Sequence, residues 1–210
     1  MDYGEEMYMK ESYFDDLLNI KTGKDQMGMP RSIHYHRYEP TPYGALQELF
    51  QVYELKKNDR VVDFGCGKGR LNFFTHYLFG STVIGIEMNE EFYQEAIENR
   101  ENYFKKKKGR RSAIEFHCCL AEEYEIHPGD NVFYFFNPFS VQIFMKIINN
   151  ILFSLEFSPR DIEIVLYYSS DDYVHYLENH PLFELRKEIN LSGEYEHNVY
   201  ERFLVYGLAY

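Results

Sequence analysis

The chain has 210 residues, which is more than a typical domain of about 150 residues but too few for two full domains. Its 45% hydrophobic and 18% aromatic residues, against 13 glycines and 7 prolines, exclude a disordered or collagen-like chain and can fill one sizeable core. The 22 basic and 34 acidic residues give a net charge of −12, which disfavours general binding to nucleic acid or to anionic membranes.

The cysteines and the first residues indicate a cytoplasmic protein. The cysteine count is odd, and Cys118 and Cys119 are adjacent, which makes a bond between them strained. We therefore expect a reducing compartment. The first residues are acidic, unlike a secretory signal, and no apolar run approaches the roughly 18 residues that a membrane span needs.

Residues 1–42 mix tyrosine, methionine and charge without a clear period, and they contain a turn at Lys21-Thr-Gly-Lys. We expect this segment to be an N-terminal extension outside the core, followed by a single domain over 43–210. After Pro42, the apolar positions recur as on one face of a helix: Leu46, Leu49, Phe50 and Tyr53.

From position 60 the pattern alternates between strands and helices. Strands are predicted at 60–64, 82–87, 113–118, 131–136 and 162–168, with an amphipathic helix after the first, second and fourth. A short helix from Asp171 to about Asn179 follows, and then two strands at 183–191 and 199–208 around Ser192-Gly193. This order predicts an α/β fold: a doubly wound, mostly parallel seven-strand sheet with helices on both faces and a C-terminal antiparallel hairpin. Ligands of such sheets bind at the carboxyl ends of the strands.

A glycine-rich turn, Asp63-Phe-Gly65-Cys-Gly67-Lys-Gly69-Arg70, joins the first strand to its helix. The spacing is GxGxG, whereas a dinucleotide fingerprint requires a glycine at position 70. The turn therefore argues against NAD or FAD. Glu87 ends the second strand, where an acidic side chain can accept hydrogen bonds from two ribose hydroxyls.

The segment from Arg60 to Asn89 resembles the cofactor half of the class I, Rossmann-like S-adenosylmethionine-dependent methyltransferases. The resemblance implies S-adenosyl-L-methionine as the cofactor. It also implies that Asp63 orders the glycine turn and holds the methionine amino group. It further implies that the turn contacts the methionine and ribose portions of the cofactor through Gly65, Cys66, Gly67 and Gly69. Glu87 would hold the ribose hydroxyls, and the Met88 side chain would lie against the adenine ring. We expect the Cys66 thiol to be packed rather than a nucleophile.

The family usually places an acid after the third strand to bind the adenine amino group, but here that position is Leu120. Two alternatives remain for the adenine contact: Glu122 could make it from a shifted register, or backbone groups of Leu120 and Ala121 could make it. A third alternative is that Glu122 and Glu123 are solvated loop acids.

The fourth strand ends in Asn137-Pro138-Phe139-Ser140, which resembles the Asn-Pro-Pro-aromatic motif of methyltransferases that act on amino groups. The resemblance implies that Asn137, Pro138 and Phe139 form the catalytic site: the asparagine and the next carbonyl accept hydrogen bonds from the acceptor amine, and the aromatic ring stacks on it. Because one of the two prolines is missing, Pro138 could instead simply begin a helix.

Upstream, Tyr38-Glu-Pro40-Thr-Pro42-Tyr43 resembles the Pro-Thr-Pro segment that precedes the core in some seven-strand methyltransferases, including protein-lysine enzymes. The resemblance implies that Thr41 and Tyr43 lie over the methionine end of the cofactor, so that 1–42 could act as a lid. The alternative is a plain connector.

Two other clusters carry less chemistry. The basic run at 105–111 could attract an anion, but it follows a helix, where solvated cations complement the helix dipole, and we favour that interpretation. His34 and His36 have no third ligand at a suitable spacing, so we expect no metal.

The sequence therefore predicts an enzyme that transfers a methyl group to an acceptor near Asn137. The expected acceptor is an amine, in a small molecule, a protein side chain or a nucleobase, and the net charge disfavours nucleic acid. The alternative is a non-catalytic S-adenosylmethionine-binding or regulatory protein of the same fold.

Overall fold

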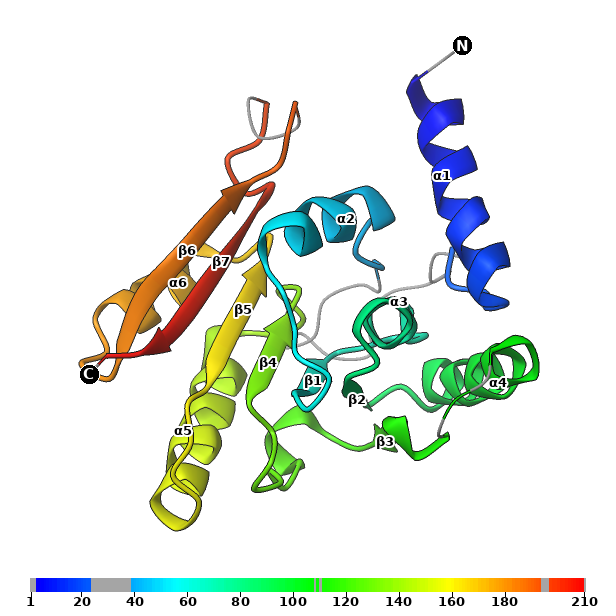
Figure 1. Cartoon of the computed structure of the whole chain (residues 1–210). Helices are drawn as coiled ribbons and strands as arrows, with labels where there is room; N and C mark the ends of the chain where they lie inside the picture. The colour runs from blue at the N-terminus through cyan, green and yellow to red at the C-terminus, as the bar shows by residue number, and fades with distance from the viewer. Residues whose placement is uncertain (1–2, 24–38, 108, 110, 194–196, 210) are drawn as a thin grey trace.

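The computed structural model describes residues 3–23, 39–107, 109, 111–193 and 197–209, and the side chains from residue 11 onward (Figure 1). Seven strands form one sheet in the order β3-β2-β1-β4-β5-β7-β6. Strands β1 to β5 are parallel, and β7 is antiparallel to both β5 and β6. The strands are β1 Arg60–Phe64, β2 Thr82–Glu87, β3 Ile114–Cys118, β4 Val132–Phe135, β5 Glu163–Tyr167, β6 Phe183–Asn190 and β7 Arg202–Leu208.

Helices cover both faces of this sheet, as the sequence predicts. On one face lie α1, α2, α3 and α4, and on the other lie α5 and α6 (Figure 1). Short 3-10 turns, η1 and η2, flank β3. The bounds are α1 Tyr3–Leu18, α2 Tyr43–Val52, α3 Arg70–Phe79, α4 Glu90–Lys106, η1 Arg111–Ala113, η2 Ala121–Glu123, α5 Val141–Phe157 and α6 Asp171–Glu178.

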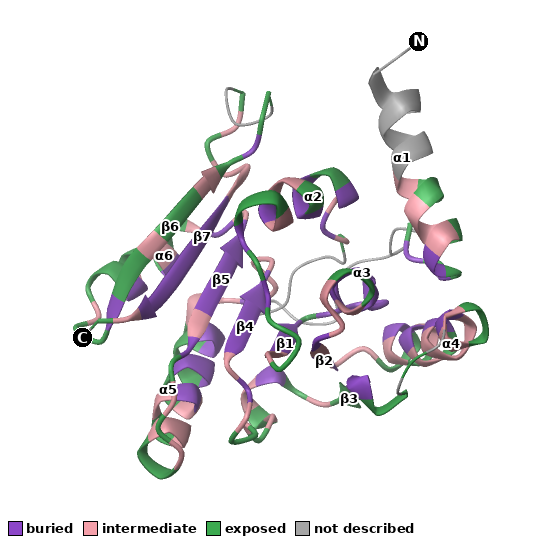
Figure 2. Cartoon of the chain, in the orientation of Figure 1, coloured by how far each residue is buried: buried purple, intermediate pink, exposed green. Residues whose placement is uncertain are grey.

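The central strands are buried on both faces because successive side chains point to opposite sides of the sheet (Figure 2). Val61 belongs to the core beneath α2 and α3, whereas Val62 belongs to the core beneath α5. The continuous apolar runs of β4 and β5 have the same cause. This two-sided burial leaves the ends of the strands as the places where polar chemistry can reach solvent.

The prediction that residues 1–42 are irregular and lie outside the core is wrong for the part that the structure describes. Helix α1 spans 16 residues, and Leu18 and Ile20 are buried in the core with α2 and α3. The Phe14 ring centroid lies 4.9 Å from that of Tyr43 and 5.3 Å from that of Phe74. The His34 and His36 pair lies outside the described residues.

A polar network around Arg70 attaches α1 to the first residue of α3. The Arg70 Nε donates to Thr22 Oγ1 at 2.8 Å, and Nη1 donates to the Thr41 carbonyl at 3.3 Å and pairs with Glu11. Asp15 accepts hydrogen bonds from the Thr22 hydroxyl and the Tyr43 hydroxyl, both at 2.7 Å. A buried cation at a helix N-terminus opposes the helix dipole, so these acceptors compensate the charge.

Replacing Tyr43 by phenylalanine should lower the free energy of unfolding by about 1.5–3 kcal/mol, because the change removes a hydrogen bond to a carboxylate and keeps the buried ring. Urea denaturation of the full chain measures this difference. The matched control is Tyr13→Phe, since the Tyr13 side chain is 60% exposed. Equal stability of the two variants would mean that the Asp15 contact does not hold α1 in place.

Candidate active site

The glycine turn after β1 has a backbone that only glycine adopts without strain. Gly65, Gly67 and Gly69 have φ values of 83°, 53° and 86°. Space also requires glycine at two of them. A Cβ atom on Gly65 would lie 2.6 Å from the Cβ of Pro138, and one on Gly69 would lie 2.7 Å from the Phe116 ring. The turn is therefore packed directly against the residues that follow β4.

Glu87 fixes the turn from the end of β2. Its Oε2 accepts a hydrogen bond from the Gly67 amide at 2.9 Å, and its Oε1 accepts one from the Asn89 amide at 2.7 Å. The amides of Gly65 and Cys66 donate to the Ile86 carbonyl at 2.9 and 3.1 Å. The carboxylate predicted to hold ribose thus also orders the turn beside it, a second role that spacing alone does not reveal.

Asp63 and Glu87 form a buried acidic pair at this edge, with exposures of 4% and 8%. Burial, with the nearby Glu87 charge, raises the pKa of Asp63 well above its ordinary value. Burial also raises the pKa of Glu87, and the amides of Asn89 and Gly67 oppose this shift. A ligand that brings a positive charge or hydroxyl donors would relieve the repulsion between the carboxylates. Such a ligand fits this site better than an anion.

The stability of the ligand-free protein should depend on the ionisation of Asp63. Since its pKa is raised in the folded state, the folded protein binds this proton more tightly than the unfolded chain. Stability is therefore greatest below the ordinary value of 3.8 and falls as pH rises toward the folded-state pKa. We expect the stability of Asp63→Asn, relative to that of the native protein, to increase as pH rises above 3.8 in urea denaturation. A stability difference that does not change with pH would contradict the raised pKa.

The two side chains within the turn, Cys66 and Lys68, contact other parts of the protein. Cys66 is buried, its Sγ lies against Gly85, and burial raises the pKa of its thiol, which agrees with the expected packing role. The Lys68 ammonium pairs with Glu95 of α4 at 3.0 Å and lies over the Phe92 ring. The turn therefore offers a ligand its backbone more than its side chains.

The end of β3 supplies the residues predicted for adenine. The Cys119 amide donates to the Glu87 carbonyl at 3.2 Å, which brings this segment next to the acidic pair. The Leu120 side chain is 36% exposed, whereas Ala121 is buried. The Glu122 carboxylate lies 3.7 Å from the Lys146 ammonium on α5. This pairing draws Glu122 toward α5 and favours the Leu120 and Ala121 alternative. Met88 is half-buried between β2 and α4.

Asn137 lies two residues after the end of the buried strand β4 and has a φ of 39°, a conformation that asparagine tolerates better than most residues. Pro138 lies over the glycine turn. Phe139 is only 1% exposed, its ring packs in the core near Phe135, and its carbonyl accepts a hydrogen bond from the Tyr173 hydroxyl. The structure thus gives Phe139 a core position rather than the predicted place against an acceptor, because the chain has already turned toward α5.

The structure separates the two residues predicted as a lid. The Thr41 hydroxyl lies 2.8 Å from the Tyr134 hydroxyl, and Tyr134 is paired in register with Asp63, so Thr41 is close to the acidic pair. Tyr43 is buried beside Arg70 and Asp15, 4.6 Å from the guanidinium, and so belongs to the core instead of covering a ligand. Tyr134 was not predicted as a site residue, because a continuous apolar run does not reveal a buried hydroxyl pair.

The described side chains of the basic run at 105–111 make separate contacts with nearby residues. Lys105 and Lys106 are in the last turn of α4, the Lys106 ammonium donates to the Asp16 carbonyl at 2.8 Å, and Arg111 pairs with Glu101 at 2.6 Å. Among the described residues, no group of three His, Cys, Asp or Glu side chains could hold a metal ion. Within the same residues, no helix combines the length and apolar character that crossing a membrane requires.

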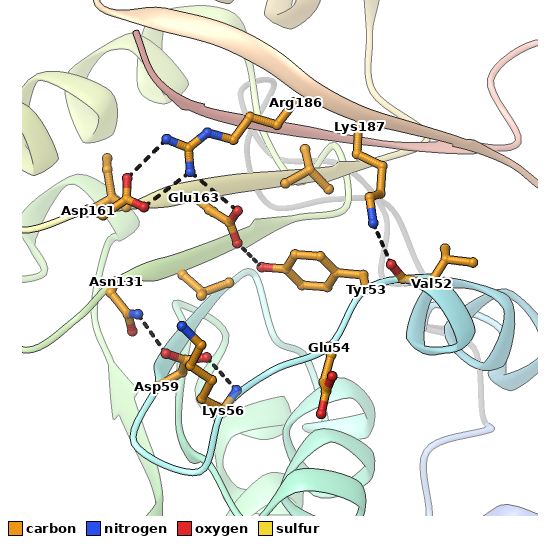
Figure 3. Close-up of a pocket in the computed structure, with 13 residues that line it drawn as sticks. Val52, Tyr53, Glu54, Lys56, Asp59, Asn131, Asp161, Glu163, Arg186 and Lys187 are labelled. Atoms are coloured by element: carbon orange, nitrogen blue, oxygen red, sulfur yellow. Dashed lines mark hydrogen bonds and ion pairs between the residues drawn. The ribbon is translucent and has the colours of Figure 1, made fainter. Parts of the chain in front are cut away.

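A pocket of about 490 Å³ lies at the opposite edge, at the amino ends of β1, β4 and β5 (Figure 3). Its charged side chains pair with one another: Arg186 lies 3.1 Å from Asp161 and 3.6 Å from Glu163, which also accepts a hydrogen bond from the Tyr53 hydroxyl at 2.6 Å. These contacts tie the C-terminal hairpin to the loop before β1. They give the pocket a structural explanation and leave the carboxyl edge as the candidate active site.

The chain is similar to known proteins over the segment that contains the glycine turn and both acids. Residues 55–133 match a family model described as a methyltransferase domain. A protein-lysine N-methyltransferase from Saccharolobus islandicus is 32% identical over 65 residues, which are 30% of this chain and 40% of that protein. The chain spans less than half the length of the curated relatives it matches.

Two crystal structures share the fold. An RNA methyltransferase from Salinibacter ruber in complex with S-adenosyl-L-homocysteine has a TM-score of 0.53 at 16% identity, over 80% of this chain and 92% of that chain. An rRNA methylase from Streptococcus thermophilus has a TM-score of 0.54 at 17% identity, over 81% of this chain and 96% of that chain.

Proposed function

We propose that the chain is a class I, Rossmann-like methyltransferase that transfers a methyl group from S-adenosyl-L-methionine to an acceptor at the carboxyl edge of the sheet. The observation that carries this proposal is the acidic pair, Asp63 and Glu87, on either side of a turn of three glycines with positive φ. The matched family segment contains both acids and the turn.

The residues of this edge fit the cofactor. Asp63 would hold the methionine amino group, because the positive charge of that group would stabilise the carboxylate charge that burial disfavours. Glu87 would hold the ribose hydroxyls. The backbone of the turn would approach the methionine and ribose because three of its residues, Gly65, Gly67 and Gly69, have no Cβ atom. Leu120 and Ala121, with Met88, would enclose the adenine. The bound cofactor supplies a methyl group that its sulfonium already activates.

We propose an amine as the acceptor, placed by Asn137. The side-chain oxygen of Asn137 and the Pro138 carbonyl can accept hydrogen bonds from an amino group and so aim its lone pair. Because the methyl donor is already activated, the protein has to position the nitrogen and exclude water. The relatives bear the names of protein and RNA methyltransferases, so the same fold is found with different acceptors.

Calorimetric titration of the full chain with S-adenosylmethionine, S-adenosylhomocysteine and NAD tests the cofactor. We expect micromolar binding of the first two ligands, no binding of NAD, and loss of binding in Asp63→Ala and Glu87→Ala. A folded protein that binds neither sulfur ligand would refute the proposal.

A further inference from the structure

The aromatic and acidic residues beyond Asn137 indicate which amine the site takes. Strands β4 and β5 are neighbours, with Phe135 opposite Leu166. Asn137 and Tyr168 each lie two residues beyond this last pair, and both have positive φ, 39° and 47°. Tyr168 is therefore beside the proposed acceptor position, at the same edge of the sheet.

Tyr168 presents a half-exposed ring at this edge. Its centroid lies 6.3 Å from that of Phe136 and 5.8 Å from that of Tyr200, and its hydroxyl accepts a hydrogen bond from Asn198 at 2.8 Å. These contacts fix the ring without covering it. The faces of tyrosine rings attract cations, including ammonium groups.

Carboxylates accompany these rings. Asp171, exposed at the start of α6, accepts a hydrogen bond from the Tyr200 hydroxyl at 3.2 Å. Glu201 accepts one from the Tyr167 hydroxyl at 2.6 Å. Arg202 follows Glu201 in the chain and pairs with Glu188 at 2.8 Å. We call Tyr168, Asp171, Tyr200 and Glu201 the acceptor face.

We propose that the methyl acceptor is an alkylammonium group, the cation of a lysine side chain or of a polyamine, received by the acceptor face. This inference rests on the proposed methyltransferase function. Tyrosine rings with carboxylates at their edge suit a compact cation, whereas a phosphate-bearing acceptor would be repelled by them and by the net charge of −12.

The transfer must begin with deprotonation, since an ammonium nitrogen has no free lone pair. The ammonium gives one proton to solvent water, and the freed lone pair then forms the new nitrogen–carbon bond. The carbon–sulfur bond breaks, and its electron pair stays on sulfur. The products are a methylated ammonium group and S-adenosylhomocysteine, with the positive charge moved from sulfur to nitrogen.

The test is methyl transfer by the full chain from S-adenosylmethionine labelled in its methyl group, with three acceptors: poly-L-lysine, spermidine and a single-stranded RNA. We expect label in one or both amines and none in the RNA. Label in poly-L-lysine alone identifies a polypeptide acceptor, and label in spermidine alone identifies a small polyamine. If S-adenosylhomocysteine binds but only the RNA, or none of the three, is labelled, the inference is wrong and the cofactor proposal stands.

Two variants locate the acceptor on this face. Asp171→Asn should raise KM for the labelled amine by about 3- to 10-fold, with kcat and S-adenosylhomocysteine affinity nearly unchanged. The matched control is Asp172→Asn, an equal change of charge at the next residue of α6, which lies outside the acceptor face. Equal effects of both variants would show that only overall charge matters and would overturn the acceptor face.

Discussion

Replacing Glu87 by alanine should weaken S-adenosylhomocysteine binding by about 30- to 1,000-fold, equivalent to about 2–4 kcal/mol. An ionised carboxylate that accepts two ribose hydroxyls contributes about 1.5–3 kcal/mol per hydrogen bond. The same carboxylate also accepts hydrogen bonds from the Gly67 and Asn89 amides, so alanine removes support from the glycine turn as well. Calorimetric titration of the full chain measures the affinity.

Two further variants distinguish loss of the ribose contact from a general loss of negative charge and from unfolding of the protein. Glu87→Gln keeps one acceptor oxygen and the size of the side chain, so its affinity should lie between those of the native protein and Glu87→Ala. Glu90→Ala removes an exposed acid three residues along and should leave the affinity unchanged. Urea denaturation identifies any variant that is unfolded. Native affinity in folded Glu87→Ala would eliminate the ribose assignment.

The alternation of strands and helices is predictable because it depends on local periodicity. The runs that become β1, β2, β4 and β5 are short, apolar and bounded by polar or glycine residues, and each is found within two residues of its predicted bounds. The seventh strand shows the limit of such prediction. It begins at Arg202 rather than at Val199, because the Arg202 amide turns back to the Tyr200 carbonyl.

The place of α1 depends on contacts that no local pattern contains. Arg70 pairs with Glu11, 59 residues earlier in the chain, and with Thr22. Leu18 and Ile20 enter the core beside these polar groups. Charged and aromatic residues are mixed in this segment without a clear period, so the sequence pattern alone predicts no helix at α1.

Parallel register explains why the candidate site could be predicted in part. Asp63 pairs with Gly85 and Glu87 pairs with Cys118, so the ends of three adjacent strands meet at one edge. Motif spacing therefore identifies the acids and the glycine turn. The burial of Phe139 and the position of Tyr168 depend on how the chain leaves β4 and β5, which the motif does not determine.

Replacing Asn137 by alanine should slow methyl transfer by about 100-fold while S-adenosylhomocysteine affinity changes by less than about twofold. The expected loss arises because the proposed acceptor amine would have no side-chain oxygen to aim its lone pair. Single-turnover transfer to poly-L-lysine or spermidine, whichever is labelled, measures the rate of the chemical step.

Backbone strain is the competing explanation, because residue 137 has a φ of 39° and alanine is strained there. Asn137→Gly removes the same side-chain oxygen but adopts this φ freely, and so it separates the two causes. If the oxygen positions the acceptor, both variants lose transfer to a similar extent. If only the conformation matters, Asn137→Gly keeps near-native rates. Loss of cofactor binding without a selective loss of transfer would place Asn137 in the support of the glycine turn, which Pro138 already contacts at Gly65.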